Sequence, residues 1–485
     1  MTIQVHDTLA RSLKPLDPPG PEPLGLYLCG PTVYADSHIG HLMGPVLYDA
    51  IVRWLRVRGY QVRFVNNITD IDDKIIRRSN ETGEDWRTIA TRFESRYRGH
   101  LAELRVETIT DHPHATDYVP EMIEFIQALV DEDKAYQTSD GVYFDVQRKE
   151  GYGKLTGRAL DDMRSGERVA ASSELRHPAD FALWKAAKPG EPTWNSPFGP
   201  GRPGWHLECS VMSRALLGTR FAFHGGGDDL KFPHHENELA QSEARGDDFA
   251  DAWMHHGLVQ YGGRKVAKSD ERMADPDFAR QFQAKWLIDT YGGATLRFFL
   301  LRGHYRRPID FQPESLDAAR KGLSRFMALL GEASEAPLAE NGYGSEALAR
   351  IQGQAPEALQ AFVRDFESAL DDDFNTGLAI AHLFRLKEVL EGDDDALRAA
   401  AARLAVGLGR LLGLFHPGDR EALRGGGAGD DGALSGALEL LIALRADARA
   451  NKDFATSDRI RDELAAAGIE LRDGADGTGW ARTEE

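Results

Sequence analysis

The chain has 485 residues, too many for one hydrophobic core, so we expect about three or four domains. With 42% hydrophobic and 28% charged residues, its composition is that of an ordinary soluble enzyme. The net charge of −19 argues against a protein that coats nucleic acid nonspecifically. A local basic surface could still bind one specific nucleic acid, so the total charge does not decide between these classes.

Targeting and redox features predict a cytoplasmic protein. The first 25 residues are polar and proline-rich, without the apolar centre of a signal peptide. No apolar run approaches the length that spans a bilayer, so no membrane partner is expected. Two cysteines in a chain of this length exclude a disulfide framework.

The N-terminal region predicts a βαβ unit. Residues 24–28 form an apolar run that ends at a Cys-Gly-Pro breaker, and residues 41–58 have apolar positions at helical spacing. Gly59 is expected to end that helix, and residues 61–66 read as the next strand. This order implies an α/β fold with a parallel sheet. Ligands bind beyond the carboxyl ends of such strands, which makes residues 29–41 the expected site.

The rest of the chain changes character several times. Residues 118–203 read as mixed and irregular, and we interpret them as an insertion in the nucleotide-binding fold. Residues 316–414 are helical in pattern and rich in Ala and Leu, and residues 425–432 have the composition of a flexible linker. The remaining tail predicts a helix or two and then a strand at 468–471.

Two histidines flank a glycine where the first helix should begin. His38, Gly40 and His41 would face the partial positive charge and the free N–H groups of the helix N-terminus, an arrangement suited to nucleotide phosphates. Glycine lets a ligand approach the backbone closely. The alternative is a surface loop with two solvated histidines, but the flanking strand and helix favour the functional interpretation.

The two cysteines form part of a possible metal set. His234 follows a proline that we expect to start a helix, so that Glu238, four residues on, would share its face. Together with Cys29 and Cys209 these residues make a ligand set compatible with zinc. The alternative is that both cysteines are small buried hydrophobes, and spacing alone cannot join three separate segments.

Two glycine-containing segments complete the possible site. Gly225 to Gly227 precede Asp228 and Asp229, so a ligand could approach the backbone while a carboxylate binds a ribose or an adenine amino group. A plain flexible turn is the alternative.

Lys265 and Lys268 follow a pair of glycines, and a loop hinged there could fold over a polyphosphate and stabilise charge during transfer. The alternative is that both lysines are merely solvated.

Taken together, these segments resemble the cysteinyl-tRNA synthetases, in the order that the family has. The resemblance covers nearly the whole chain and is carried by CGPTVYADSHIGH, NNITDIDDKI, GRPGWHLECS, GGGDDLKFPHHENELAQSEA, WMHHGLV, HYRRPIDF, DDDFNT, NKDFATSDRIRDELAAAGIEL and GTGW. It implies a class I Rossmann-like catalytic domain at 1–118 and 204–250, split by a connective insertion at 119–203. A stem-contact region with a KMSKS-like loop is implied at 251–315, a helical bundle at 316–424, a linker at 425–432 and an anticodon-binding module at 433–485.

The resemblance also implies roles for single residues. The family's zinc ligands fall on Cys29, Cys209, His234 and Glu238, and its HIGH motif falls on His38 to His41. His38, His41, Lys265 and Lys268 are implied as catalytic, Gly40, Asp229 and Lys268 as ATP-binding, and Thr69, Trp205 and His224 as lining the cysteine pocket. Candidate tRNA contacts in the tail are Arg445, Arg449, Lys452, Arg459 and Arg461, although each could equally be an ordinary solvated side chain.

The implied activity is that of a cysteine–tRNA ligase with one Zn²⁺ per chain. It would use ATP with Mg²⁺ to activate L-cysteine, load tRNA-Cys and act as a monomer. Cysteine and serine differ by one atom, which an apolar pocket discriminates poorly, whereas zinc selects a thiolate over a hydroxyl. No additional segment for an editing domain is expected.

One segment departs from the family. KMSKS appears here as KVAKS, and the Leu-Gly-Asn that usually follows is Asp270-Glu271-Arg272. Two carboxylates beside a polyphosphate should weaken ATP binding by repulsion, or alter loop closure. Two rival functions follow: a cysteine ligase paralogue with an amine acceptor, which the family-like tail opposes, and a catalytically impaired tRNA-binding paralogue, which the intact zinc and HIGH residues oppose.

Overall fold

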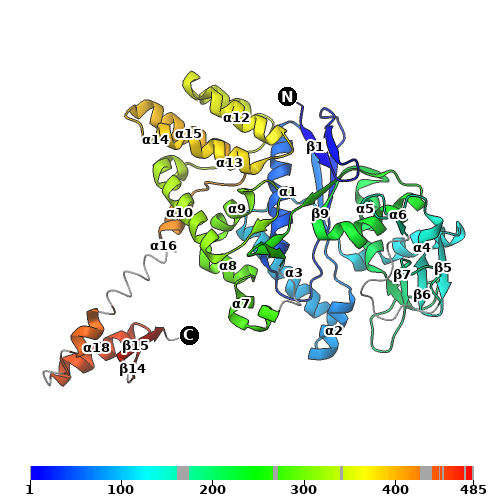
Figure 1. The fold of residues 1–485 in the computed structure, drawn as a ribbon, viewed down its shortest axis with the longest axis horizontal. Coiled ribbons are helices and arrows are strands. Elements are labelled where there is room, and N and C mark those ends of the chain that lie inside the picture. The colour runs from blue at the N-terminus through cyan, green and yellow to red at the C-terminus, as the bar shows by residue number, and fades with distance from the viewer. Residues whose placement is uncertain are drawn as a thin grey trace. The chain divides into compact units, whose positions relative to one another are not determined.

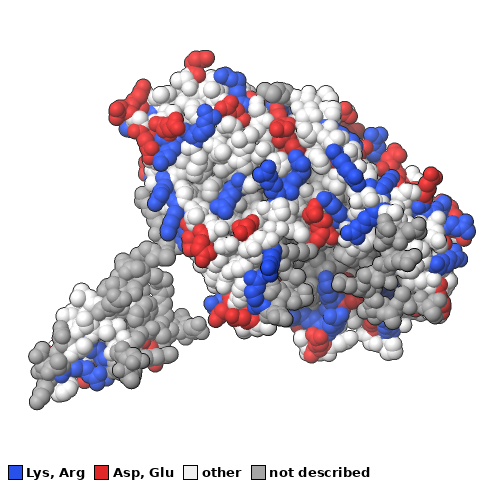
Figure 2. All heavy atoms as spheres, in the orientation of Figure 1, with Lys and Arg blue, Asp and Glu red and all other residues white. Residues whose placement is uncertain are grey.

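The computed structural model describes residues 2–160, 174–265, 271–338, 342–425, 438, 440–446, 448–449, 453–474 and 477–482. The chain forms two compact units, Met1–Arg420 and Glu421–Glu485 (Figure 1). Lys and Arg are interspersed with Asp and Glu over the face shown in Figure 2, so the net negative charge of the sequence is not gathered on that face.

A four-stranded parallel sheet forms the centre of the first unit. Its strands lie in the order β10 (Phe249–His256), β9 (Arg220–Gly227), β3 (Leu24–Leu28) and β4 (Val62–Asn66). Every neighbouring pair is parallel, with Leu26 beside Phe223 on one side and Phe64 on the other. The predicted α/β fold with a parallel sheet is therefore confirmed, and all four strands end at the same edge.

Helix α1 (Ile39–Val57) connects β3 to β4 and lies against the sheet (Figure 1). It begins two residues before the predicted start, because His38 rather than a later residue caps it. Nearly all of its residues are buried, including Asp49. The Asp49 carboxylate accepts hydrogen bonds from Arg53 (2.7 Å) and from Arg297 (2.5 Å) of helix α9 (Gly293–Leu301). A buried carboxylate with two guanidinium partners fixes α1 against α9.

The segment between β4 and β9 contains more regular structure than its sequence suggests. Helix α4 (Val119–Asp131) precedes an antiparallel sheet with the order β5 (Ala135–Thr138), β6 (Gly141–Phe144), β7 (Phe181–Ala186) and β8 (Gly201–Pro203). The expectation of irregular structure there was wrong, because strands this short give little alternation to detect. A buried apolar cluster that includes Phe144, Leu183 and Trp184 joins this sheet to Leu207 of helix α5 (Trp205–Leu217).

The remaining elements of the first unit are mostly helical, in agreement with the helical pattern of 316–414. They are α2 (Asp73–Thr82), α3 (Trp86–Glu103), α6 (Glu236–Ala244), α7 (Pro276–Arg280), α8 (Ala284–Tyr291), α10 (Pro313–Leu330), α11 (Ala347–Gln354), α12 (Gln360–Asp371), α13 (Thr376–Arg385), α14 (Lys387–Leu390) and α15 (Asp395–Leu411), with the short strands β1 (Gln4–Asp7), β2 (Ser12–Pro15), β11 (Val259–Tyr261), β12 (Arg264–Lys265) and β13 (Ile309–Asp310). Helix α16 (Asp419–Gly425) begins in the first unit and continues into the second. The domain boundaries predicted within this unit stay predictions.

The second unit is small. Its described part contains helical residues at 440–446, helix α18 (Phe454–Ala466) and an antiparallel hairpin of β14 (Ile469–Gly474) and β15 (Gly477–Arg482). Leu438, Leu464 and Ile469 form its buried cluster. The strand predicted at 468–471 is therefore present and extends to Gly474. None of the described helices combines the length and apolar character that crossing a bilayer requires.

Candidate active site

Four side chains from three separate segments meet at the carboxyl edge of the central sheet. Cys29 follows β3, Cys209 lies in α5, His234 precedes α6, and Glu238 lies in α6. One ligand atom from each lies within 4.8 Å of all the others. Helix α6 begins at Glu236, but a π-helical turn over Lys231–His235 runs directly into it, and Phe232 is the one residue of that turn with non-helical φ and ψ. Helical backbone therefore follows from the proline, and His234 and Glu238 lie four residues apart on one face, as predicted.

The distances within this cluster, which we call the metal quartet, fit a tetrahedral zinc site. Sγ of Cys29 lies 3.7 Å from Sγ of Cys209 and 3.5 Å from Oε1 of Glu238. Nε2 of His234 lies 3.6 Å from Sγ of Cys209 and 3.0 Å from Oε1 of Glu238. Zinc bonds in tetrahedral geometry separate two thiolates by about 3.8 Å and a thiolate from an imidazole by about 3.5 Å. The quartet is therefore compatible with zinc in both residue type and spacing.

Burial and mutual contacts shift the ionisation of the quartet. Burial raises the pKa of Cys29 well above its ordinary value. Burial opposes ionisation of Cys209 too, but hydrogen bonds from Cys29 and His234 outweigh it and lower its pKa to about 6. Burial lowers and Glu238 raises the pKa of His234, with a net rise to about 10. A buried cluster of thiol, imidazole and carboxylate groups with such shifted pKa values is typical of a site that binds a cation.

A second layer of histidines surrounds the quartet. It consists of His224, which was predicted to line the cysteine pocket, and of His235 and His255, which were given no role from sequence. Nε2 of His224 lies 2.8 Å from Oε2 of Glu238, which holds the carboxylate in place. His235 approaches Sγ of Cys29 to 3.3 Å through Nε2, while its Nδ1 pairs with Nε2 of His255 at 2.8 Å. Cys29, His224, His235 and Glu238 consequently form a second group with metal-ligating spacing. The paired histidines in FPHHENE and WMHHG were the signal that could have revealed this layer.

Predicted cysteine-pocket residues border the quartet. The ring of Trp205 is 36% exposed and stacks on His234 with centroids 4.0 Å apart. Thr69 is buried, and its hydroxyl donates to Oε2 of Glu208 (3.1 Å), the neighbour of Cys209. Asn67, which sequence reasoning missed, accepts from the N–H of Gly30 at 2.8 Å. With His224 beside Glu238, all three predicted pocket residues lie next to the quartet or to its immediate neighbours.

The two histidines of the HIGH segment stack on each other at the start of α1, with ring centroids 3.7 Å apart. The first backbone N–H groups of the helix are not free. Ile39 donates to the Phe282 carbonyl (2.9 Å), Gly40 to Nδ1 of His38 (3.1 Å) and His41 to the His38 carbonyl (2.9 Å). The expectation that free N–H groups would bind phosphate here was wrong, because the imidazole of His38 and the loop around Phe282 use them.

The imidazoles themselves remain as donors. Nδ1 of His38 accepts from Gly40, and Nδ1 of His41 accepts from the N–H of His38 at 3.3 Å. Each neutral ring must therefore carry its proton on Nε2. Burial lowers the pKa of His38, with Asp229 acting in the opposite direction. Burial, together with His38, lowers the pKa of His41 to about 3. Asp229 thus lies near the HIGH segment, where an adenosine contact was predicted.

The glycine run before Asp229 serves internal packing. A Cβ at Gly225 would lie 2.4 Å from the ring of Tyr48 on α1, and a Cβ at Gly226 would lie 2.5 Å from the ring of His235. The expectation that these two glycines open the backbone to a ligand was wrong. Their small size instead allows α1 and His235 to pack against the end of β9.

The lysine loop is described only at its start. Lys265 is the last residue of β12, and 266–270, which include Lys268 and Asp270, lie outside the described residues. The roles predicted for both lysines stay predictions.

Among the candidate tRNA contacts, Lys452 also lies outside the described residues. Arg445 is buried, whereas Arg449, Arg459 and Arg461 are exposed. Arg461 pairs with Asp458 at 3.2 Å.

Three family models match the chain in sequence. They are described as the tRNA synthetases class I (C) catalytic domain at residues 16–321, the DALR domain at 365–416 and the cysteinyl-tRNA ligase anticodon binding domain at 431–480. A cysteine–tRNA ligase of Thioalkalivibrio sulfidiphilus is 44% identical over 488 residues, covering 99% of this chain and 100% of the relative. That of Heliobacterium modesticaldum is 41% identical, with 99% and 100% covered.

Solved structures support the fold. A LeuRS of Agrobacterium radiobacter, solved in a ternary complex with tRNA and LeuAMS, has a TM-score of 0.56 at 13% identity and covers 84% of this chain and 85% of its own. The methionyl-tRNA synthetase of Mycobacterium tuberculosis bound by methionyl-adenylate has a TM-score of 0.52 at 14% identity, covering 81% and 90%. At these identities the likeness extends to the class I fold alone.

Proposed function

Because the chain belongs to the cysteine–tRNA ligase family, an ATP-dependent class I aminoacyl-tRNA synthetase family, we propose that its metal quartet holds one Zn²⁺ and that L-cysteine, ATP and tRNA-Cys are its substrates. The protein would act in the cytoplasm, where charged tRNA is consumed, and as a monomer. The observation that carries the proposal is the meeting of Cys29, Cys209, His234 and Glu238 at the carboxyl edge of the sheet.

Zinc, when bound, would supply a soft Lewis acid that prefers the substrate thiolate to the hydroxyl of serine. The chain's own residues orient what binds there. His224 holds the second oxygen of Glu238, and Trp205 stacks on His234, so both ligand side chains keep one orientation. Because Thr69 and Glu208 lie beside Cys209, they are placed to meet polar groups of the bound amino acid.

The attack on the α-phosphate of ATP would take place beside His38 and His41, at the start of α1. The cysteine carboxylate attacks the α-phosphate of ATP, an oxygen–phosphorus bond forms, and pyrophosphate leaves. Neutral His38 and His41 would each donate an Nε2 proton to phosphate oxygens that gain charge, without adding a formal positive charge. Lys265 and Lys268 would supply that positive charge together with Mg²⁺, and Asp229 would contact the adenosine.

Transfer to tRNA completes the reaction. A hydroxyl of the terminal ribose attacks the carbonyl carbon of cysteinyl adenylate, and AMP leaves. The anticodon-binding match at 431–480 supports tRNA rather than a small amine as the acceptor.

The test compares ATP–pyrophosphate exchange with cysteine and with serine, together with the zinc content, in the wild type and in Cys209→Ser. We expect exchange with cysteine only, one zinc per chain, and loss of both in the variant. Met212→Leu is the matched control, because Met212 is equally buried on α5 but is not a member of the quartet. Exchange that persists in zinc-free Cys209→Ser would refute the zinc part of the proposal.

Adding tRNA then separates the two halves of the reaction. Cysteine-dependent exchange accompanied by charging of tRNA-Cys supports the complete proposal. Exchange without charging would point to an amine acceptor, and tRNA binding without exchange would point to a non-catalytic role.

A further inference from the structure

Residues 149–158, which lie between β6 and β7, contact the helix that carries part of the metal quartet, and we call them the clamp segment. Their main partner is Glu236, the first residue of α6, whose side chain is buried. Oε1 of Glu236 accepts from the backbone N–H of Gly153 at 2.9 Å and from that of Leu155 at 3.4 Å. Oε2 accepts from the N–H of Thr156 at 3.0 Å and from its hydroxyl at 3.1 Å. Both carboxylate oxygens are therefore bound to the clamp segment.

The backbone of the clamp segment is shaped to receive an anion. Gly151 and Gly153 have φ angles of 74° and 95°, in the left-handed region that glycine adopts readily. Left-handed residues within a series of turns direct successive N–H groups toward one point, which forms a concavity that binds anions. The carboxylate of Glu236 fills this concavity, so the fold of the clamp segment determines where that carboxylate lies.

The clamp segment also contacts α6 beyond its first residue. The hydroxyl of Tyr152 donates to Oδ1 of Asn237 at 2.5 Å, and both side chains are buried. At the other end of the helix, Nζ of Lys149 lies 2.8 Å from the carboxylate of Glu243, and Lys154 pairs with the same carboxylate. The clamp segment therefore holds both the first and the last turn of α6.

The turn that precedes α6 is in contact with the clamp segment as well. The guanidinium of Arg158 lies 4.8 Å from the ring centroid of Phe232, a cation–π contact. His234 follows Phe232 in that turn, and Glu238 follows Glu236 in α6. Since residues two apart on a helix do not share a face, Glu236 holds the helix from the side opposite to these two members of the quartet.

We propose that Glu236 is a positioning residue for the metal quartet, an inference that rests on the proposed zinc site. Its carboxylate, bound in the clamp segment, fixes the position of α6 and with it the 3.0 Å separation of Nε2 of His234 from Oε1 of Glu238. Ligands that are already in place lose little conformational freedom when the ion binds. The affinity for zinc thus depends on a segment that supplies no member of the quartet.

The experiment measures the Kd for zinc in the complete protein by competition with a chelator, in the wild type and in Glu236→Gln. Glutamine keeps the size of Glu236 but turns an NH₂ group toward donors that need an acceptor. Outer partners of metal ligands typically account for about 10- to 100-fold in affinity. We expect the Kd to rise about tenfold, the lower end of that range, because Glu236 acts through the backbone of α6.

Asp180→Asn is the matched control. Asp180 is also a buried carboxylate between β6 and β7, but it accepts from Tyr136 (2.7 Å), from the N–H of Val146 (3.0 Å) and from the N–H of His177 (2.9 Å), none of which belongs to α6. We expect this variant to lower the midpoint of urea unfolding and to leave the Kd for zinc unchanged. A rise of the Kd in Asp180→Asn equal to that in Glu236→Gln would overturn the proposal, because general destabilisation would then explain both.

Two uncharged substitutions separate position from charge, since Glu236→Gln also removes a negative charge near the ion. Tyr152→Phe deletes the hydroxyl that binds Asn237, and Thr156→Val deletes one of the four donors to Glu236. Both should raise the Kd for zinc by a smaller factor than Glu236→Gln does. Wild-type affinity in both variants would assign the effect to charge and overturn the proposal.

Failure of this proposal differs from failure of the proposed ligase function. Equal zinc affinities in the wild type and in all three clamp variants, with cysteine-dependent ATP–pyrophosphate exchange intact, would overturn the positioning role alone. Weakened zinc binding in the clamp variants without any exchange by the wild type would support the positioning role and refute the ligase. A wild type that binds no zinc would overturn both.

Discussion

The thiol end and the phosphate end of the proposed catalytic site are built differently, although both lie at the carboxyl edge of one sheet. At the thiol end, Cys209, His234 and Glu238 are buried almost completely, and their ligand atoms already have the spacing that a tetrahedral ion requires. At the phosphate end, the donors are two neutral imidazoles on the first turn of α1, and the first N–H groups of that helix are already used.

This difference in construction implies that the thiol end determines which amino acid binds and that the phosphate end determines how fast the reaction proceeds. A preformed, buried ligand set costs little to organise when its ion binds, which favours discrimination between thiol and hydroxyl. Donors without formal charge interact weakly with ground-state ATP and more strongly with the charge that develops in the transition state. We therefore expect changes at the thiol end to alter metal content and amino-acid choice, and changes at the phosphate end to alter turnover or ATP binding without altering metal content or amino-acid choice.

The largest effect is expected from His38→Ala at the phosphate end. Loss of one donor to developing charge typically lowers kcat by about 10²- to 10³-fold. Zinc content and the preference for cysteine over serine should not change, because His38 does not contact the quartet. Pre-steady-state ATP–pyrophosphate exchange together with metal analysis measures both. Loss of zinc in this variant would show that the two ends are not independent.

A smaller effect is expected from His224→Gln at the thiol end. Removing the imidazole that holds Glu238 leaves all four ligands present, and such outer partners typically account for about 10- to 100-fold in metal affinity. Competition with a zinc chelator measures the affinity, and exchange at saturating zinc measures turnover. Equal zinc affinities in variant and wild type would mean that His224 does not orient the carboxylate.

The sequence departure after the lysine loop predicts a change of a few-fold. Asp270→Gly combined with Glu271→Asn removes two carboxylates next to the expected polyphosphate. A solvent-exposed charge contributes about 1 kcal/mol at contact distance and less when it lies farther away and salt screens it, so the combined change in the KM is a few-fold. The KM for ATP should fall, and the fall should shrink at high salt because the repulsion is screened. An unchanged KM at low salt would contradict the hypothesis of weakened ATP binding.

The smallest effect is a pH dependence of stability from His41. Its pKa in the folded protein, about 3, lies below the ordinary value of 6.5, so the unfolded chain binds a proton that the folded chain does not. Stability therefore falls as pH drops below about 6.5, by about 1 kcal/mol from this residue between pH 7.5 and 5.5. His41→Asn should reduce this dependence of the unfolding free energy on pH, which is measured by urea unfolding of the first unit at several pH values. Identical slopes in variant and wild type would rule out a buried neutral ring.

The sequence predicted the local elements well and the three-dimensional neighbourhoods less well. The apolar spacing at 41–58 and the short apolar runs on either side were sufficient to predict the βαβ unit. Such patterns reflect burial along a single segment, which a sequence shows directly. The meeting of Cys29 with Cys209 and Glu238 could be expected only from the resemblance to a family. Helical spacing connects His234 with Glu238, but no local pattern connects that segment with Cys29 or with Cys209.

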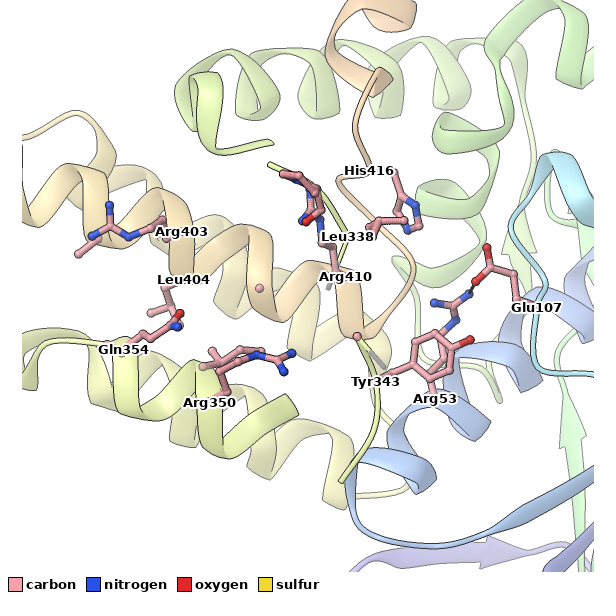
Figure 3. Close-up of a pocket in the computed structure, with 16 residues that line it drawn as sticks. Arg53, Glu107, Leu338, Tyr343, Arg350, Gln354, Arg403, Leu404, Arg410 and His416 are labelled. Atoms are coloured by element: carbon pink, nitrogen blue, oxygen red, sulfur yellow. Dashed lines mark hydrogen bonds and ion pairs between the residues drawn. The ribbon is translucent and has the colours of Figure 1, made fainter. Parts of the chain in front are cut away.

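Other features depend on tertiary packing and left no sequence signal. In the sequence, the glycines at 225 and 226 fit a ligand-approach motif and a turn equally well. The structure supports a third role, because Tyr48 and His235 pack against these glycines and leave no room for a larger side chain. The antiparallel sheet of β5, β6, β7 and β8 has strands too short to show alternation. The cavity drawn in Figure 3 has its lining from α1, α11 and α15, so no single stretch of sequence carries its composition.

The burial of α1 has a consequence for how the His38 and His41 donors keep their position. Since almost no face of this helix meets solvent, its amide hydrogens should exchange with deuterium only when the whole first unit opens. The donors sit on its first turn, so their position is maintained by the global unfolding free energy and not by a local loop equilibrium. Surface loops around the site can therefore open and close many times without moving the two imidazoles that we propose as donors to the phosphate.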